Sequence, residues 1–156
     1  MSLLPELFEL QIVTPERLVL REEAHEAQIP GKNGYMGILP GHAPLLSELR
    51  VGEVSYRRGN RWGFLAVCWG FVEVLSNRVI ILAETAERAE EIDVARAQAA
   101  RQRAEERLAR AAQDPAVDLN RAQVALERAL IRLQVARRGA GAAPPGAPPI
   151  EHVPAP

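Results

Sequence analysis

Apolar and polar side chains alternate along short segments in the first half of the chain. The alternation is regular over residues 8–12 and again over residues 25–29. A period of two residues is typical of a strand that buries one face and exposes the other. A further strand is predicted over Leu49–Arg58, where β-branched, aromatic and small residues follow one another before a turn.

Two β-hairpins are predicted after this strand. Gly59 and Asn60 tolerate the positive φ angles of a two-residue turn, and they lead into a strand over residues 61–67. The second hairpin is predicted from two mainly apolar segments, 71–75 and 79–82, which flank the turn Ser76-Asn77. Many short strands with frequent turns favour a small antiparallel sandwich or barrel over a parallel sheet.

The composition changes sharply after these strands. All seven aromatic residues lie at or before Phe71, and alanine and arginine dominate the following part of the chain. Between Gly70 and Gly139 there is no glycine, and Pro115 is the only proline. Such a change marks a boundary near residues 84–88, between a strand-rich half and a helical half.

Two helices are predicted in the second half, separated by residues 113–117. Glu90, Glu91 and Asp93 are expected in the first turn of helix one, where carboxylates favour the helix dipole. Asp118 is expected to cap helix two. Apolar seams run along one side of each helix, at Ala97, Ala100, Ala104, Leu108 and Ala111 in the first and at Leu119, Ala122, Leu126, Ala129, Leu133 and Ala136 in the second.

These seams predict an antiparallel hairpin with a thin interface. An alanine buries one methyl group, whereas a fully buried leucine contributes about 1.5–3 kcal/mol. The helices are therefore expected to be stable locally and docked weakly, which is a physical basis for a conformational switch. A hairpin that stays in one place and serves only as structure fits the same pattern.

Charge and targeting signals exclude several partners. The formal net charge is −1, so neither nucleic acid nor an anionic membrane is expected as the main partner. The N-terminus does not resemble a signal peptide, and no apolar run reaches the roughly 18 residues of a membrane span. Any membrane association is therefore expected to go through a partner protein. The single cysteine, Cys68, fits a reducing compartment.

The sequence contains no recognisable arrangement of catalytic residues. His25, His42 and His152 lie far apart without metal-ligand spacing, so no metal site is predicted. Cys68 lies in an apolar run and is expected in the core. The segment 31–34 has Gly-Lys-Asn-Gly but no Ser or Thr after the lysine, so it is interpreted as a glycine turn and not as a phosphate-binding loop.

Four arginines of the helical half form one candidate site. Arg96 and Arg103 are seven residues apart on one face of helix one, and Arg128 and Arg132 are four apart on helix two. In an antiparallel hairpin these guanidinium groups would converge, and their forks match phosphate oxygens well. A solvated basic face is the alternative, with partners Glu105, Glu106 and Glu127.

The chain resembles a known family at two motifs. Residues 37–44, Gly-Ile-Leu-Pro-Gly-His-Ala-Pro, resemble a signature of ATP synthase epsilon subunits, and residues 83–93 resemble that family's passage from sandwich to hairpin. The resemblance covers residues 7–138. It implies a two-part β + α fold, with an antiparallel β-sandwich (1–85) followed by an antiparallel α-helical hairpin (86–138). The tail (139–156) is rich in Pro, Ala and Gly and cannot build a core, so its composition predicts a disordered extension.

The resemblance implies a non-catalytic subunit in the rotating central stalk of a bacterial proton-translocating F-type ATP synthase. The sandwich of such subunits packs against gamma, and its loops rest on the ring of c subunits. The ring-facing residues implied here are Lys32, Asn33, Gly34, Tyr35 and His42. Two departures from the family pattern are Tyr35, where an acidic residue is frequent, and Trp69 in Cys68–Phe71, where small residues are common.

The resemblance also implies a regulatory hairpin. In the family this hairpin can extend into the catalytic alpha/beta head and block ATP hydrolysis, and in some members bound ATP holds it folded. ATP would be a regulatory ligand and no cofactor would be required. The motif Ile-Asp-x-x-Arg-Ala matches in full, and the implied ATP-binding residues are Glu87, Ile92, Asp93, Arg96, Ala97, Arg103, Arg128 and Arg132.

The implied location is the cytoplasmic face of the bacterial inner membrane, with attachment only through the complex. The main alternative is an adaptor module with a purely structural hairpin, unrelated to rotary coupling. A hydrolase is a second alternative, and the sequence offers no catalytic constellation for it.

Overall fold

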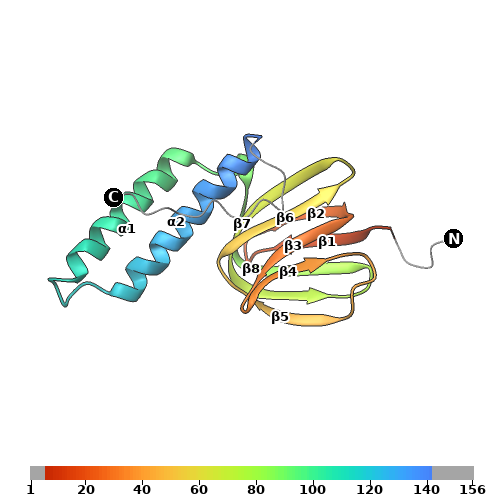
Figure 1. Ribbon diagram of the computed structural model, residues 1–156, viewed down its shortest axis with the longest axis horizontal. Coiled ribbons are helices and arrows are strands. Elements are labelled where there is room, and N and C mark those ends of the chain that lie inside the picture. Colours follow the sequence, from red (N-terminus) through yellow and green to blue (C-terminus); the bar gives the residue numbers. More distant parts are fainter. Residues whose placement is uncertain (1–5, 142–156) are drawn as a thin grey trace.

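A computed structural model describes residues 6–141 as a β-sandwich followed by a two-helix hairpin (Figure 1). The predicted sandwich and hairpin are both confirmed. The predicted disordered tail lies outside the described residues from 142 onward. The strands are β1 (Phe8–Val13), β2 (Leu18–Ala24), β3 (Glu26–Gly31), β4 (Gly34–Ile38), β5 (Leu45–Leu49), β6 (Gly52–Arg58), β7 (Arg61–Val74) and β8 (Arg78–Arg88).

The long strands β7 and β8 pair with each other and connect the other strands of the sandwich. Along its first half β7 pairs with β6, and along its second half it pairs with β5, while β8 follows it on the other side. Within the described part of the chain, all strand pairs are antiparallel except β1 with β8. The predicted turns at Gly59-Asn60 and at Ser76-Asn77 both lie between paired strands.

Two strand boundaries were predicted wrongly. Leu49–Arg58 is not one strand, because β5 ends at Leu49 and β6 begins at Gly52, where the chain passes from one half of β7 to the other. Conversely, the runs at 61–67 and 71–75 belong to the single strand β7, which bends at Trp69 and Gly70. An alternating pattern continues through such corners and does not reveal them.

The main hydrophobic core fills the interior of the sandwich. Its largest fully buried side chains include Phe8, Leu10, Ile12, Leu20, Ile29, Ile38, Leu65 and Ile81. Cys68 is also buried, which confirms its prediction as a small core residue. The segment 31–34 is a turn between β3 and β4, with Gly34 at a φ of 132°, so the glycine-turn interpretation is confirmed as well.

Helix α1 (Val94–Ala111) begins later than predicted. Glu90 and Glu91 lie in a separate 3-10 turn, η1 (Ala89–Glu91), and not in the first turn of the helix. The backbone then becomes extended, and the Asp93 carboxylate caps α1 by accepting from the Arg96 N–H at 3.0 Å. An N-cap aspartate requires this extended conformation, which ends η1 before α1 can start.

Helix α2 (Leu119–Gly139) runs antiparallel to α1 and carries the predicted cap at Asp118. The seam between the helices is alanine-rich as expected, with Ala97, Ala104, Ala122 and Ala129 buried. Leu119 was wrongly placed in this seam, because its side chain is 52% exposed at the start of the helix.

Helix α2 contacts β6, β7 and η1 of the sandwich. Val135 is fully buried here, in a second cluster with Phe64, Ala66, Ala89 and Ile92. Gly139 allows the end of α2 to approach η1, since an added Cβ would lie 2.6 Å from the Cβ of Ala89. The hairpin is therefore docked through one helix, on a small apolar cluster surrounded by charged contacts.

Candidate functional site

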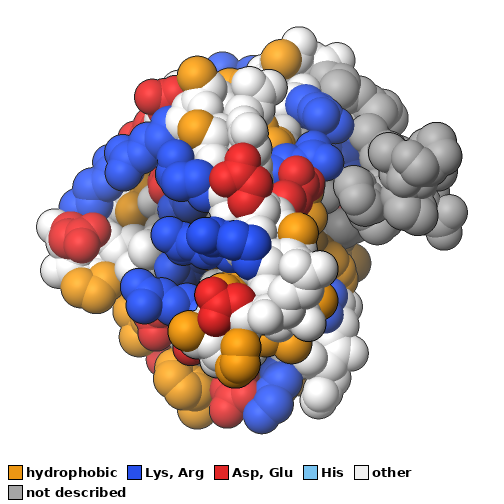
Figure 2. Space-filling view, turned by 90° about the vertical axis from the view of Figure 1, so that its left-hand side faces the viewer, with side chains coloured by type: hydrophobic (Ala, Val, Ile, Leu, Met, Phe, Trp, Pro, Cys, Tyr) orange, Lys and Arg blue, Asp and Glu red, His pale blue; other side chains and the backbone are white. Residues whose placement is uncertain are grey.

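A pocket of about 340 Å³ lies where the sandwich passes into the hairpin. Six of the eight implied ATP-binding residues line it. The lining residues are Glu87, Glu91, Asp93, Arg96, Ala97, Ala100, Arg103 and Arg132. On the face of the molecule turned toward the viewer in Figure 2, Lys and Arg side chains gather in rows with carboxylates beside them.

Four elements supply the pocket side chains. Glu87 comes from the end of β8, and Asp93 lies at the cap of α1. Arg96 and Arg103 lie two turns apart on α1, because a spacing of seven residues returns to the same helix face. Arg132 approaches from α2. The pocket thus exists in this form only while the hairpin is docked.

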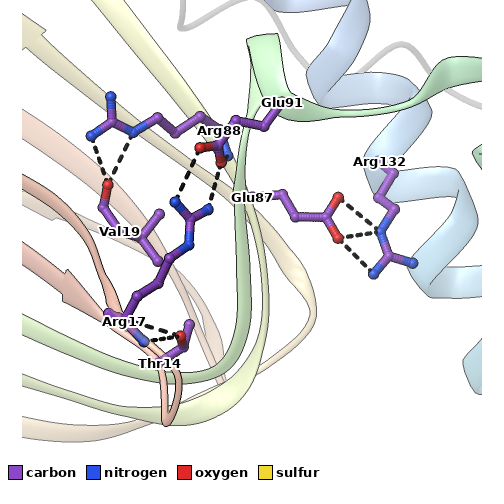
Figure 3. A network of polar contacts seen from close by, with 7 residues as sticks. All are labelled: Thr14, Arg17, Val19, Glu87, Arg88, Glu91 and Arg132. Carbon is purple, nitrogen blue, oxygen red and sulfur yellow. Dashed lines mark hydrogen bonds and ion pairs between the residues drawn. The ribbon is translucent and has the colours of Figure 1, made fainter.

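The Glu87 carboxylate is held by Arg132 (Figure 3). The Arg132 Nε donates to both oxygens at 3.0 and 3.1 Å, and its Nη2 lies 2.9 Å from Oε1. Both side chains are partly shielded from water, with 29% and 34% exposure. This paired contact fixes α2 to the last strand of the sandwich, and charge-assisted bonds of this kind are among the stronger ones in proteins.

Glu91 is held in a similar way by a different arginine (Figure 3). Arg17 donates to its two oxygens at 2.8 and 3.2 Å, and the Arg88 N–H donates at 3.2 Å. The hydrogen bond from Arg17 lowers the pKa of the Glu91 carboxyl below its ordinary value. Arg88 itself donates to the carbonyl oxygen of Val19. These contacts give the sandwich side of the pocket a fixed shape.

All three carboxylates of the pocket are therefore engaged by donors. Two of its three arginines differ: within residues 6–141, the guanidinium groups of Arg96 and Arg103 form no ion pair or hydrogen bond. The pocket consequently presents two cations that protein groups do not neutralise. Arginine forks match phosphate and carboxylate oxygens, so this arrangement is suited to an anion.

Arg128 and Ile92 are the two implied site residues that do not line the pocket. The Arg128 guanidinium carbon lies 4.4 Å from the ring centroid of Trp69. The Ile92 side chain is buried in the small cluster beneath α2. The structure therefore brings together three of the four arginines predicted to converge, and it directs the fourth to an aromatic ring.

The implied ring-facing residues lie in two separate segments. Lys32 and Asn33 form the β3–β4 turn, and the Lys32 Nζ lies 2.7 Å from Glu48. Tyr35 is half exposed, and its hydroxyl accepts from the Glu53 N–H at 3.2 Å. His42 lies in the β4–β5 connection, where its Nδ1 is 2.7 Å from the carbonyl oxygen of Ala43.

Sequence reasoning missed a further contact between α2 and the sandwich. The Arg138 Nε lies 3.5 Å from the Glu53 carboxylate, and both side chains are nearly buried. Gln134 donates to the same carboxylate at 3.4 Å. Burial raises the pKa of Glu53, although Arg138 and Gln134 act in the opposite direction. The only sequence signal for this contact was Glu53 itself, a charged residue within the run 52–55, which is buried in the structure.

Comparison with known proteins identifies the family. The model of the ATP synthase delta/epsilon chain β-sandwich domain matches residues 7–89, and that of its long α-helix domain matches residues 90–137. The chain belongs to the ATP synthase delta/epsilon chain family. An epsilon chain of Syntrophotalea carbinolica is 52% identical over 130 residues, which are 83% of this chain and 94% of that one.

A second relative and one solved structure are also similar to this chain. An epsilon chain of Koribacter versatilis is 62% identical over 101 residues, covering 65% of this chain and 71% of that protein. A chain of the Euglena gracilis mitochondrial ATP synthase, solved by cryo-EM with OSCP, F1 and c-ring, shares the fold. Its TM-score is 0.71 at 23% identity, covering 89% of this chain and 84% of that chain.

Family membership confirms the resemblance found in the sequence. The chain is an epsilon-type subunit of the F-type ATP synthase, a non-catalytic part of its central stalk. Over the described residues, the protein has no helix long and apolar enough to cross a bilayer.

Proposed function

We propose that this subunit couples proton-driven rotation to ATP synthesis in a bacterial enzyme, and that its hairpin binds ATP and restrains ATP hydrolysis. The observation that carries the ATP proposal is the pair of guanidinium groups, Arg96 and Arg103, that face the pocket without a partner among residues 6–141. A triphosphate between them would replace repulsion between like charges by charge-assisted hydrogen bonds.

Each pocket residue has a role in this proposal. Arg96 and Arg103 bind phosphate oxygens from α1, and Arg132 approaches the same anion from α2 while it holds Glu87. Asp93 fixes the start of α1, so that Arg96 and Ala97 face the pocket. Since these residues come from both helices and from β8, the nucleotide binds the docked hairpin only and shifts the population toward it.

Removal of either unpaired arginine is expected to weaken ATP binding. Arg103→Ala should raise the dissociation constant about tenfold, the loss expected for one charge-assisted hydrogen bond. The Asp93→Ala, Arg96→Ala double variant should abolish measurable saturation. Isothermal titration of ATP against the whole chain measures both effects.

Arg107→Ala is the matched control, because Arg107 is an exposed arginine of the same helix that lies outside this pocket. Its affinity for ATP should equal that of the unchanged protein. Absence of saturable binding at millimolar ATP would contradict the nucleotide proposal and leave the family assignment intact.

The outer face of the sandwich is proposed to pack against the gamma subunit. Leu46, Phe71 and Leu82 are exposed by 71%, 52% and 54%, and they lie on the neighbouring strands β5, β7 and β8. Phe71 and Leu82 are directly opposite in the register. Exposed apolar residues that gather on one face of a sheet mark a protein interface.

Phe71→Glu is expected to prevent stable association with gamma, because it places a charge in the middle of this apolar face. Co-purification of the two subunits measures the effect. Leu119→Glu is the control, since Leu119 is exposed to the same extent but lies at the start of α2. If both variants co-purify with gamma equally well, gamma binds another face.

The proposal includes two further contacts of the subunit, with the c-subunit ring and with the catalytic head. The β3–β4 turn with Lys32, Asn33, Gly34 and Tyr35, together with His42, faces the ring of c subunits. The extended hairpin reaches the catalytic alpha/beta head. The complex holds the subunit at the cytoplasmic face of the bacterial inner membrane.

A purely structural hairpin is the second candidate. It is favoured by the ligand-independent contacts of α2 with the sandwich, in which Arg132 pairs with Glu87 and Arg138 lies beside Glu53. A disulfide that locks α2 to the sandwich separates the two candidates. Unchanged ATP hydrolysis by the locked complex, under conditions that release the hairpin of the unlocked one, would support the structural role.

A further inference from the structure

Trp69 has an unusual backbone conformation. Its φ is +44°, and it is the only non-glycine residue with a positive φ in the described part of the chain. An L-residue other than glycine in the left-handed region costs about 1–2 kcal/mol, most of all when its side chain is bulky. A strained residue persists only where the surrounding structure holds it, and such residues often have a functional role.

The strain lies at the bend of β7. Cys68 and Gly70 on either side pair with Thr85 and Ala83 of β8, whereas Trp69 has no partner in the register. The indole is half-buried and lies beneath Arg128 of α2, whose guanidinium carbon is 4.4 Å from the ring centroid. This close approach across the ring face is the geometry of a cation–π contact.

Within the described part of the chain, Arg128 forms no ion pair with a carboxylate. Its Nε is inaccessible to water and has no hydrogen-bond partner among the described residues. Burial of a guanidinium N–H without an acceptor is unfavourable, so the face of Trp69 provides the main compensation. Arg132, one turn further along α2, has Glu87 as its partner instead. Two adjacent arginines of α2 thus contact the sandwich by different means.

We propose that Trp69 is a docking residue for the hairpin and that Arg128 binds this ring instead of the nucleotide. The strained backbone at the bend directs the indole toward α2, and the arginine that packs on it holds the helix in place without any ligand. The inference on docking stands independently of ATP. Its statement about Arg128 and nucleotide rests on the proposed ATP site.

Amide hydrogen exchange of the whole chain without nucleotide tests the docking role. Trp69→Asn removes the ring and retains a residue that tolerates positive φ. This variant and Arg128→Ala should each speed exchange in α2 about 3- to 10-fold relative to β1, as expected from the strength of cation–π contacts. The double variant should exchange no faster than either single one, because both substitutions remove the same contact.

Two control variants distinguish the loss of the Trp69–Arg128 contact from a general loss of stability. Trp69→Phe keeps an aromatic face and should show a smaller increase, while Glu127→Ala changes an exposed neighbour of Arg128 and should show none. If Trp69→Asn also speeds exchange in β1, Trp69→Phe replaces it in the comparison. The effect of Arg128→Ala is then measured both in the Trp69→Phe protein and in the unchanged protein. Rate increases that multiply in the double variant, or an unchanged rate in Arg128→Ala, would overturn the proposal.

ATP titration of the same variants tests the second part. If Arg128 acts only through docking, Trp69→Asn and Arg128→Ala should weaken ATP binding equally, and the double variant no further. A larger loss in Arg128→Ala would show direct contact with the nucleotide and overturn this part. If the unchanged protein does not bind ATP, the proposed nucleotide site fails, while the exchange experiment still decides the docking role.

Discussion

Replacing Gly70 by alanine is expected to destabilise the protein by about 3–4 kcal/mol, a large share of the stability of a small domain. Gly70 has a φ of +126°, and an added Cβ would lie 1.8 Å from the Leu82 carbonyl oxygen. That oxygen belongs to the backbone of the paired strand β8, so it cannot move aside as a flexible side chain would. Urea unfolding followed by tryptophan fluorescence measures the change.

Gly59→Ala separates the steric clash from the cost of a positive φ. Gly59 also has a positive φ, of +61°, but an added Cβ there would meet nothing within 4 Å. Its substitution should therefore cost only about 1 kcal/mol. Equal losses for the two variants would show that β8 shifts freely away from Gly70, and that the bend of β7 does not depend on this close approach.

The bend of β7 also shows what the sequence could not predict. Alternating side chains identified strands at 61–67 and 71–75, and both runs lie in β7. Their fusion into one strand depends on Gly70 approaching β8, a tertiary contact across the β7–β8 hairpin. Local periodicity carries no information on such contacts, so the two runs looked like separate strands. The same limit explains why Leu49–Arg58 was taken for one strand.

The candidate site was predictable where it depends on helix geometry. The spacing of Arg96 and Arg103 placed both on one face of α1, and the structure brings both to the pocket. Arg128 was predicted to join them from its spacing to Arg132. The structure instead places its guanidinium group against Trp69, which departs from the family pattern but whose positive φ could not be predicted from local sequence. The direction of a long side chain is set by its tertiary neighbours.

The buried contact between Glu53 and Arg138 provides the second large effect. Glu53→Ala is expected to cost about 2 kcal/mol, because it removes a nearly buried carboxylate that accepts from Gln134 and lies beside Arg138. Glu53→Gln retains an oxygen that can accept from Arg138 and carries no charge that burial disfavours, so it should cost less than about 1 kcal/mol at pH 7. Urea unfolding of the three proteins at pH 7 measures the ranking.

The dependence on pH shows whether burial or pairing dominates at Glu53. Burial is the largest influence and raises the pKa of Glu53 above its ordinary value of 4.5. The folded protein then binds this proton more readily than the unfolded chain. The free energy of unfolding should therefore rise, relative to Glu53→Gln, as the pH falls from the folded pKa toward 4.5.

The comparison with Glu53→Gln removes the contribution of other carboxyl groups. Glu91, for example, has a lowered pKa and makes the folded protein less stable in acid, but it does so equally in both proteins. Unfolding is measured at intervals between pH 7 and pH 4.5. If the unchanged protein instead loses stability relative to the variant in this range, the ionised Glu53 is stabilised more by Arg138 and Gln134 than it is disfavoured by burial. The hairpin would then be held by an ion pair that acid weakens, and not by a carboxyl group that protonation relieves.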